Sequence, residues 1–361
     1  MRDLLRLLAL PIRGIQRGSR ATVNALDGSD ASRSAGAVAM RRLLGFLFIG
    51  YAVLLSTKGL LEGAFPSFAN LLMAMFGAAV IANLTGRFIR DWTLVLAGLF
   101  AYVLAGRYAQ GLNMPIHYLP QIDADRVLGG GTLPNEWLQR HLYHGKTGPL
   151  EIFAVAMYVS HFFAPLLLGF YIWLRRMSGA FKELMFAILA TSVMADIVFV
   201  LFPTAPPWLA AEHGGLVHVH HLLKQSMLDL HLNGFASLIG DSHRYNIVAA
   251  LPSMHAAFPV IGLIVALRYG LPRWIVGLQT VQLLGVVFAI VYLGDHYVID
   301  ALAGGAFAVL GAAVVHRLLS RADFSSAAVA DVAELPALRP TPAEIPSASA
   351  EAPALVLDAR S

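Results

Sequence analysis

The sequence predicts an all-α integral membrane protein with about eight transmembrane helices, and two observations carry that prediction. Hydrophobic residues make up 57% of the 361 residues and charged residues only 13%, whereas soluble domains carry about 25% charged residues. The apolar residues also gather into runs of about 20 residues, the length that a helix needs to cross roughly 30 Å of hydrocarbon. A soluble core could not hide so much apolar sequence, so we expect a polytopic membrane protein.

Eight apolar stretches are long enough to be membrane spans. They cover residues 43–62, 69–86, 91–110, 151–174, 182–202, 253–270, 273–294 and 296–319. Between them lie two large loops, 111–150 and 203–252. The tail beyond Arg321 is rich in Ala, Pro and Ser and has no periodic apolar face, so we expect residues 322–361 to be disordered.

The basic residues predict the orientation of these spans in the membrane. Most Lys and Arg residues fall in segment 1–42 and in alternate connections, all on one side. They are Arg2, Arg6, Arg13, Arg17, Arg20, Arg33, Arg41, Arg42, Arg87, Arg90, Arg175, Arg176, Lys182, Arg268, Arg273, Arg317 and Arg321. Basic residues mark cytoplasmic loops. We therefore expect a multi-pass protein of the cell membrane with both termini in the cytoplasm and both large loops outside.

Composition excludes several classes of function. The chain has no cysteine, so disulfides, zinc–thiolate sites and iron–sulfur clusters are excluded. The net charge is +4, but the basic residues do not form a face interleaved with aromatic residues, as nucleic-acid binding would require. We therefore expect no nucleic-acid partner. Nothing in the sequence specifies an oligomeric state.

Two short motifs place histidines at the same membrane surface. "NIVAALPSMHAAFPV" (246–260) brings Ser253 and His255 to the start of the sixth span. "YLGDHYVIDALAGG" (292–305) brings His296 to the start of the eighth, with Asp300 four residues on. With the N-terminus inside, both span starts lie at the outer surface. We therefore expect the two histidines to lie close together there.

These residue types suit phosphorus chemistry. Residues i and i+4 share a helix face, so the Asp300 carboxylate is expected to bind one imidazole nitrogen of His296 and leave the other free as a nucleophile. Free N–H groups at the start of the sixth span, near Ser253, favour an anion such as phosphate. The eighth span is expected to begin near Asp295, which places His296 in a first turn where the helix dipole favours the neutral ring.

The alternative interpretation is that these histidines have no catalytic role. A single histidine in the first turn of a membrane helix is usually an interfacial residue. An Asp at depth is different, because ionisable groups inside a membrane are costly and mark functional sites by default. Together, the two histidines, the aspartate and the serine favour a site. The small-residue pairs Ala301–Gly305 and Gly304–Ala308 are interpreted as close helix packing.

The motifs resemble a known family. "PSMH" followed by "HYVID" is similar to the second and third signature motifs of the type 2 phosphatidic acid phosphatase superfamily. "YLGDHYVIDALAG" is most similar to its inositolphosphorylceramide-synthase-like, or inositolphosphotransferase, branch. The resemblance covers about residues 150–320. It implies a metal-independent phosphoryl-transfer site with no cofactor. His296 would form a phosphohistidine, Asp300 would orient it, His255 would be the general acid and base, and Ser253 would contact phosphate.

Charge and composition, together with the six-helix core that the resemblance implies, divide the chain into four parts. Residues 1–42 would be a cytoplasmic basic segment, 43–90 two additional transmembrane helices, 91–321 a six-helix catalytic core of the phosphatidic-acid-phosphatase type, and 322–361 the disordered tail. The donor would be a lipid phosphate or phospholipid and the acceptor water or an alcohol. The reaction would take place at the outer leaflet, as either hydrolysis or transfer of a head group such as phosphoinositol.

The chain departs from the broader superfamily in its basic residues. The arginine that normally stands six residues before the nucleophilic histidine is Ile290 here, and the first motif, a lysine followed by Arg-Pro, is absent. "LFPTAPPWL" (201–209) occupies the corresponding place. We therefore name Arg244, and behind it Lys224, as the candidate partners of the phosphate.

Other interpretations remain open. The histidines of "EHGGLVHVHH" (His213, His218, His220 and His221) are dense enough to bind zinc or a related ion, although no nearby Cys or spaced carboxylate completes such a site. A transporter or channel with a His/Asp proton relay is the alternative of another class, but no internal repeat supports it. An inactive scaffold is disfavoured by the intact Ser, His, His and Asp set. Trp208 and Trp137 are interpreted as interfacial anchors.

Overall fold

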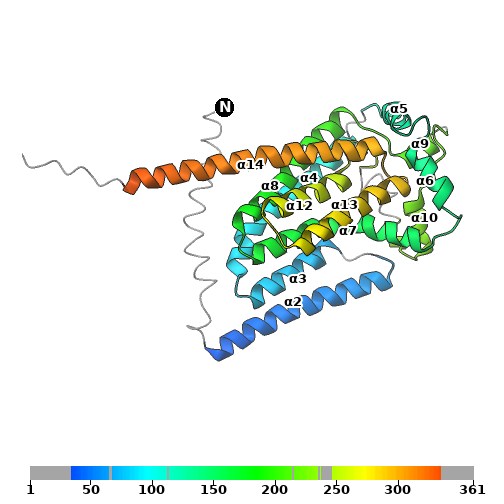
Figure 1. Ribbon diagram of the computed structural model, residues 1–361. Helices are drawn as coiled ribbons and strands as arrows, with labels where there is room; N and C mark the ends of the chain where they lie inside the picture. The colour runs from blue at the N-terminus through cyan, green and yellow to red at the C-terminus, as the bar shows by residue number, and fades with distance from the viewer. Residues whose placement is uncertain are drawn as a thin grey trace, which may run out of the picture. The chain divides into compact units, whose positions relative to one another are not determined.

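The computed structural model describes residues 34–64, 67–111, 114–213, 215–234, 236 and 246–334. This part of the chain is helical and contains no β-strand, only isolated bridges that join Thr204 to His117 and Ala249 (Figure 1). The longer helices are α2 (Ala35–Leu61), α3 (Phe68–Ile81), α4 (Thr85–Gly111), α7 (Pro149–Leu174), α8 (Ser178–Leu201), α12 (Met254–Arg268), α13 (Arg273–Tyr292) and α14 (Val298–Glu334). Shorter helices form in the two large loops: α5 (Leu119–Leu128), α6 (Pro134–Leu142), α9 (Pro207–Glu212) and α10 (Leu222–Asp229).

Each predicted span coincides with one longer helix, but fewer of these helices are long and apolar enough to cross a membrane. Five meet that condition in the described residues: α2, α7, α8, α13 and the Val298–Arg321 part of α14. Helices α3 and α12 are apolar but have only 14 and 15 residues, which at about 1.5 Å per residue is less than the hydrocarbon thickness. The chain is a multi-pass membrane protein, and the count of eight spans is not confirmed.

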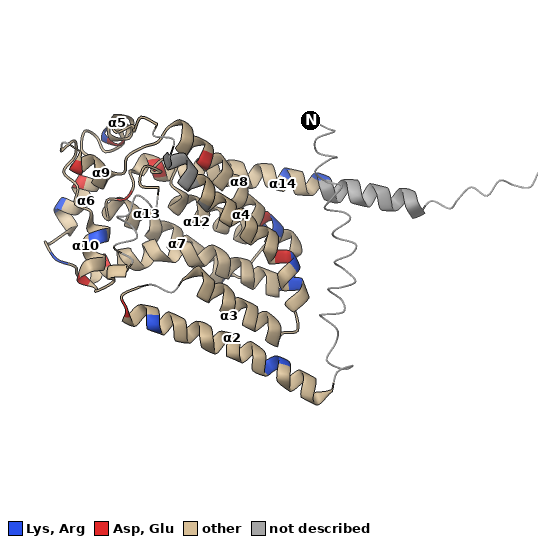
Figure 2. Ribbon diagram, turned by 180° about the vertical axis from the view of Figure 1, so that it is seen from behind, with Lys and Arg blue, Asp and Glu red and all other residues tan. Residues whose placement is uncertain are grey.

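In two of the membrane-spanning helices, charged residues lie only near the ends. Helices α7 and α13 carry their charged residues, Glu151 and Arg273, only in the first turn. Figure 2 shows the middle of these helices without blue or red segments. Large apolar side chains such as Leu278 and Leu284 of α13 are more than half exposed. An apolar exterior between polar ends is the pattern that a lipid environment favours.

Two element boundaries differ from those expected. Helix α2 begins at Ala35, where Ser34 accepts a hydrogen bond from the Ala37 amide, so the end of the segment expected at 1–42 is helical. Arg41 donates to the carbonyl groups of Val80 and Ile81 and thereby caps the end of α3. Residues 1–33 lie outside the described residues.

The segment expected to be disordered begins as helix. Helix α14 continues through Arg321 to Glu334, so the described part of the segment expected to be disordered is helical. Residues 322–334 include Ala-rich sequence with no Pro or Gly, which allows a helix to continue. Residues 335–361 lie outside the described residues.

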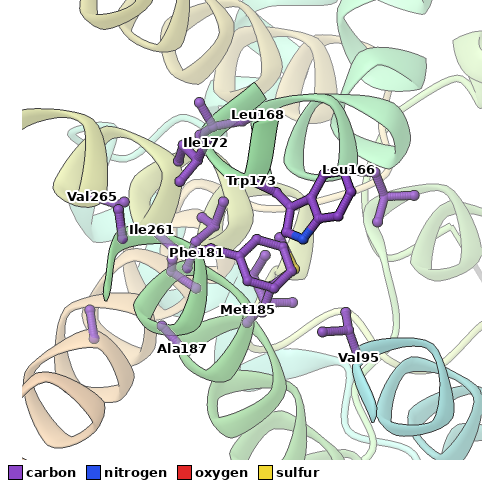
Figure 3. Packing of buried hydrophobic residues seen from close by; sticks show 14 of the residues in the cluster. Val95, Leu166, Leu168, Ile172, Trp173, Phe181, Met185, Ala187, Ile261 and Val265 are labelled. Carbon is purple, nitrogen blue, oxygen red and sulfur yellow. The ribbon is translucent and has the colours of Figure 1, made fainter. Parts of the chain in front are cut away.

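The apolar core is centred on α12. This helix packs against α7, α8 and α13, while α4 packs on α8. Large buried side chains fill the space between them, with Trp173 of α7 beside Phe181 and Met185 of α8 (Figure 3). Ile261 and Val265 of α12 are fully buried in the same cluster. The start of α12, which carries the histidine motif, is therefore held by packing on three sides.

A glycine lets α14 approach the start of α12 closely. A methyl group at Gly304 would overlap the carbonyl oxygen of Ser253, whereas one at Gly305 would meet only the side chain of Val260 at 4.0 Å. The prediction that small residues bring the last span close to its neighbours is confirmed at Gly304. The backbones on which His255 and His296 are carried are adjacent for this reason.

Candidate active site

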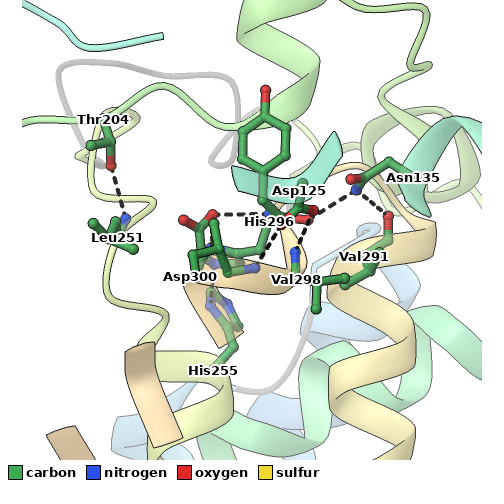
Figure 4. A network of polar contacts seen from close by, with 11 residues as sticks. Asp125, Asn135, Thr204, Leu251, His255, Val291, His296, Val298 and Asp300 are labelled. Carbon is green, nitrogen blue, oxygen red and sulfur yellow. Dashed lines mark hydrogen bonds and ion pairs between the residues drawn. The ribbon is translucent and has the colours of Figure 1, made fainter. Parts of the chain in front are cut away.

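His255 and His296 face each other in a buried position. His255 is the second residue of α12, and His296 lies in the turn between α13 and α14. The distance between His296 Nε2 and His255 Nδ1 is 3.1 Å. The residues are 5% and 6% exposed. Figure 4 shows the two rings in contact. The expectation that the two motifs meet at one end of the bundle agrees with this geometry.

Asp300 lies behind His296, although not in the way that was expected. Helix α14 begins at Val298, so His296 precedes the helix and does not share a helical face with Asp300. A turn brings the pair together instead: the Tyr297 amide donates to Asp300 Oδ2 at 2.9 Å. His296 Nδ1 is 3.5 Å from the same oxygen. This is longer than an ordinary hydrogen bond, and such contacts often tighten only when substrate binds.

The turn before α14 depends on a glycine. Gly294 has φ of 86°, a left-handed conformation that glycine adopts without strain. A methyl group at this position would lie 2.7 Å from the carbonyl oxygen of His220. The Gly294 carbonyl accepts from the Trp208 amide at 3.1 Å. The turn that presents His296 is therefore tied to α9.

Ser253 connects α12 to α14. It stands immediately before α12, and its own amide donates to the main-chain oxygen of Asp300 at 3.0 Å. Its hydroxyl is buried and has no hydrogen-bond partner within the protein. His255 Nε2 and Asp300 Oδ1 also lack partners. Buried polar atoms are nearly always paired, so three unpaired atoms at one point indicate a place prepared for a polar ligand.

Two residues of the first large loop hold the turn in place, and the sequence did not reveal them. The carboxylate of Asp125 on α5 accepts from the amides of Val298 and Ile299, both at 2.8 Å. Asn135 on α6 donates to the carbonyls of Val291 and His296 at 2.7 and 2.9 Å (Figure 4).

These contacts satisfy the start of α14. Burial raises the pKa of the Asp125 carboxyl, and the two amides oppose that shift because they stabilise the carboxylate. Tyr297, the residue before α14, has no short side-chain acceptor with which to cap the helix. The missing N-cap side chain is the sequence signal that another segment has to cap the start of α14.

A third histidine packs on His255. His161, in the middle of α7, has its ring centroid 3.9 Å from that of His255. Its Nδ1 lies 2.6 Å from the carbonyl oxygen of Tyr158, so Nδ1 carries the proton. His161 is 4% exposed. It was missed because a single histidine in an apolar helix gives no pattern.

A cleft opens beside the histidine pair. It has a cavity volume of about 120 Å³. Its wall includes His255, His296, Asp196 of α8, Asp295 and Trp208. Trp208 stacks on His221 with ring centroids 4.5 Å apart, so it is part of the cleft wall.

The expected phosphate partners do not take part in the described cleft. Lys224 is exposed on α10 and is not among the residues that form the wall, so the structure does not bring it to the histidines. Arg244 lies outside the described residues. The residues described in the cleft wall include no Lys or Arg. Among the described residues, the first-turn amides of α12 supply a positive field there.

The histidines of the second large loop point to different partners. His213 stacks on Tyr118 with centroids 4.5 Å apart, and His221 lies between Trp208 and Asp295, with Nε2 3.4 Å from Asp295 Oδ1. Within the described residues, no three His, Cys, Asp or Glu side chains form a group that could hold a metal ion.

Comparison with known proteins assigns the family. The model of the PAP2 (type 2 phosphatidic acid phosphatase) superfamily matches residues 122–314, more than half of the chain. A phosphoinositol dihydroceramide synthase of Bacteroides thetaiotaomicron is 28% identical over 165 residues, which is 45% of this chain and 54% of that protein. The chain therefore spans about half the length of the curated relative that it matches. No solved structure matches. The matched segment contains both histidine motifs and the residues that hold them, and the chain belongs to the PAP2 superfamily.

Proposed function

We propose that this chain is a membrane phosphotransferase that moves a phosphorylated head group, such as phosphoinositol, from a phospholipid donor to an alcohol acceptor. The observation that carries the proposal is the pair of buried ring nitrogens 3.1 Å apart, His296 Nε2 and His255 Nδ1. Asp300 faces the other nitrogen of His296, so His296 Nε2 keeps a lone pair, and this nitrogen faces His255 Nδ1. Water in place of the alcohol would make the same site a lipid phosphatase.

The first step forms a phosphohistidine. His296 Nε2 attacks the phosphorus, and the bond between phosphorus and the diacylglycerol oxygen breaks. His255 gives its proton to the departing oxygen. The Asp300 carboxylate stabilises the positive charge that His296 acquires. The Ser253 hydroxyl and the first amides of α12 lie where they can bind the phosphoryl oxygens.

The second step returns the enzyme to its starting state. His255, now neutral, takes the proton of the acceptor hydroxyl, whose oxygen attacks the phosphorus. The bond between phosphorus and His296 Nε2 breaks, and its electron pair returns to the ring. Each proton that His255 gives in the first step is thus replaced in the second, and no metal ion is required.

Two observations favour transfer over hydrolysis. The relative from Bacteroides thetaiotaomicron is named a synthase, and the arginine expected of hydrolytic members is Ile290. Ile290 is fully buried in the apolar cluster of α13 with Val286 and Ala289. Its carbonyl accepts from the amides of Asp295 and His296 at 3.0 Å. The Ile290 carbonyl therefore stabilises the turn before α14, and its side chain supplies no positive charge to a phosphate.

Covalent labelling tests the proposal. Donor phosphatidylinositol labelled at phosphorus should leave acid-labile, base-stable label on the purified protein in detergent, and His296→Ala should abolish it. His255→Ala should slow the release of label, because the acceptor loses its base. A transferase discharges the label much faster to one added alcohol than to water. Release to water with no acceptor effect would assign a phosphatase, and turnover without any trapped label would exclude the covalent mechanism.

We also propose that the site faces the outside of the cell. The loops that surround it carry α5, α6, α9 and α10, and most basic residues lie in the other connections. Because the chain has no cysteine, single cysteines can report sidedness. Val127→Cys on α5 should react with a membrane-impermeant thiol reagent in intact cells, and Lys182→Cys on α8 should not. The opposite pattern would place the site in the cytoplasm.

A further inference from the structure

Asp196 occupies the wall of the cleft without a partner. It lies near the end of α8, on a different helix from the two histidine motifs, and is 9% exposed. Its Oδ1 has no hydrogen-bond partner within the protein. A carboxylate placed in an apolar helix is costly to bury. Because no described side chain compensates it, the cost points to a ligand.

A second unpaired group in the same cleft has the opposite hydrogen-bonding character. Asn246 Nδ2 is buried without a partner, while its Oδ1 accepts from the Val248 amide at 3.2 Å. The cleft therefore offers one free acceptor, on Asp196, and one free donor, on Asn246. Neighbouring hydroxyl groups satisfy both, since each hydroxyl donates and accepts. An ammonium group would satisfy only the carboxylate.

Aromatic rings complete this part of the cleft. Tyr102 of α4 and Trp208 of α9 line it together with Asp196. Aromatic faces pack well against the carbon–hydrogen faces of a ring that bears hydroxyls. The Asp196 carboxylate makes its own part of the cleft unfavourable for an anion. Phosphate therefore belongs at the histidine end and an uncharged group at the other.

We infer that Asp196 and Asn246 bind the hydroxyl groups of a polyol head group, such as a cyclitol or sugar, that is attached to the phosphate. The inference rests on the proposed function, because it places the phosphorus at His296. The polyol then stays bound beside the phosphohistidine after the diacylglycerol has left. Asp196 is thus a specificity-determining residue, and it takes no proton in either step.

Binding measurements on the purified full-length protein in detergent test this subsite. The probes are inositol 1-phosphate, phosphoethanolamine and inorganic phosphate, each titrated calorimetrically. The wild type should bind inositol 1-phosphate roughly tenfold or more tighter than inorganic phosphate, the ratio expected for hydrogen bonds to a charged group. Asp196→Ala should remove that preference and change the affinity for inorganic phosphate less than about twofold.

A matched variant and a stability measurement distinguish binding from structure. Ser192 is buried on α8 one turn before Asp196 and does not line the cleft, so Ser192→Ala should keep both affinities. Asp196→Ala should unfold at the same temperature as the wild type or higher, because it removes an unpaired buried carboxylate. A clear fall in its unfolding temperature, together with an unchanged preference for inositol 1-phosphate, would overturn the inference.

Two further outcomes separate the inference from the proposed function. A wild-type preference for phosphoethanolamine that Asp196→Ala removes would assign a cationic head group and overturn the polyol subsite. If the preference for inositol 1-phosphate is present but no label is trapped on His296, the covalent mechanism fails and the subsite stands. If label is trapped but inositol 1-phosphate binds no better than phosphate, the subsite fails and the mechanism stands.

Discussion

Two buried polar clusters lie at the two ends of α12, and they differ in how completely their atoms are paired. At the end of the helix, Glu183 of α8 is fully buried. One of its carboxylate oxygens accepts from the Arg268 guanidinium, and the other accepts from the Tyr269 hydroxyl at 2.9 Å and faces His316 Nδ1 at 2.8 Å. We call this the Glu183 cluster.

The histidine cluster at the start of α12 shows the opposite pattern. Ser253 Oγ, His255 Nε2, His296 Nδ1 and Asp300 Oδ1 are all buried, and none has a hydrogen-bond partner. Unpaired buried groups reduce stability, and active sites often carry this cost because their partners arrive with the substrate. The comparison teaches that the Glu183 cluster joins helices, whereas the histidine cluster is arranged for a ligand. Each of the following predictions tests that distinction.

The largest expected effect is on catalysis, at Asp300. Asp300→Asn should lower turnover by about three to four orders of magnitude, because an amide cannot stabilise the cationic ring of His296. The unfolding temperature should change little, since the carboxylate accepts only the Tyr297 amide. Single-turnover labelling and thermal unfolding on one preparation would measure both. Near-normal turnover would remove Asp300 from the mechanism.

The second effect is on stability, at Glu183. Glu183→Gln should lower the free energy of unfolding by about 2–3 kcal/mol, because it takes the charge from a buried pair. The effect is smaller than for a fully buried pair because the Arg268 side chain is 33% exposed. Turnover per folded molecule should stay within about twofold. The control is Lys182→Gln at the exposed neighbouring position. A large loss of turnover in Glu183→Gln alone would contradict the assignment of a purely structural role to the Glu183 cluster.

The third effect compares two adjacent glycines of α14. Gly304→Ala should cost about 1–3 kcal/mol, because the new methyl group overlaps the Ser253 carbonyl and forces α14 away from α12. Turnover should fall as well, because the histidines separate. Gly305→Ala, which meets only Val260 at 4.0 Å, should be neutral in both respects. Equal effects of the two substitutions would show that the close approach of α14 to α12 at Gly304 does not determine the distance between the two histidines.

The smallest effect is local, at Asp125. Asp125→Ala should cost about 1 kcal/mol through the loss of a helix cap. Amide hydrogen exchange should accelerate at Val298 and Ile299, the two groups that the carboxylate accepts from. Asp123→Ala, at an exposed position of the same helix, is the control. Unchanged exchange at the start of α14 would mean that Asp125 does not hold the turn.

The parts of the site that could be predicted are the residues that lie close together in the sequence, within short motifs. Ser253 and His255 are two residues apart, His296 and Asp300 four, and the alternation of spans brings both pairs to one surface. The supporting contacts could not be found this way, because Asp125 and Val298 are 173 residues apart in sequence. Asp196 and His161 lie singly in apolar helices, where neither spacing nor composition marks them.

The fold likewise has features that the sequence predicts and features that it does not. Apolar runs located every longer helix, because the membrane requires such runs. They did not locate helix ends, which depend on local hydrogen bonds such as those of Ser34 at α2 and of Tyr297 before α14. The helices within the two large loops, which supply Asp125 and Asn135, were not predicted either. Their sequences are mixed in polarity and give no membrane signal.

The main-chain bond between Ser253 and Asp300 has a mechanical consequence. The amide of the residue before α12 donates to a carbonyl in the first turn of α14, so the two helix starts are linked directly through their main chains. Membrane helices tilt when the thickness of the bilayer changes. We therefore expect a tilt of α14 to carry the start of α12 with it, which would keep the spacing of the two rings constant in bilayers of different thickness.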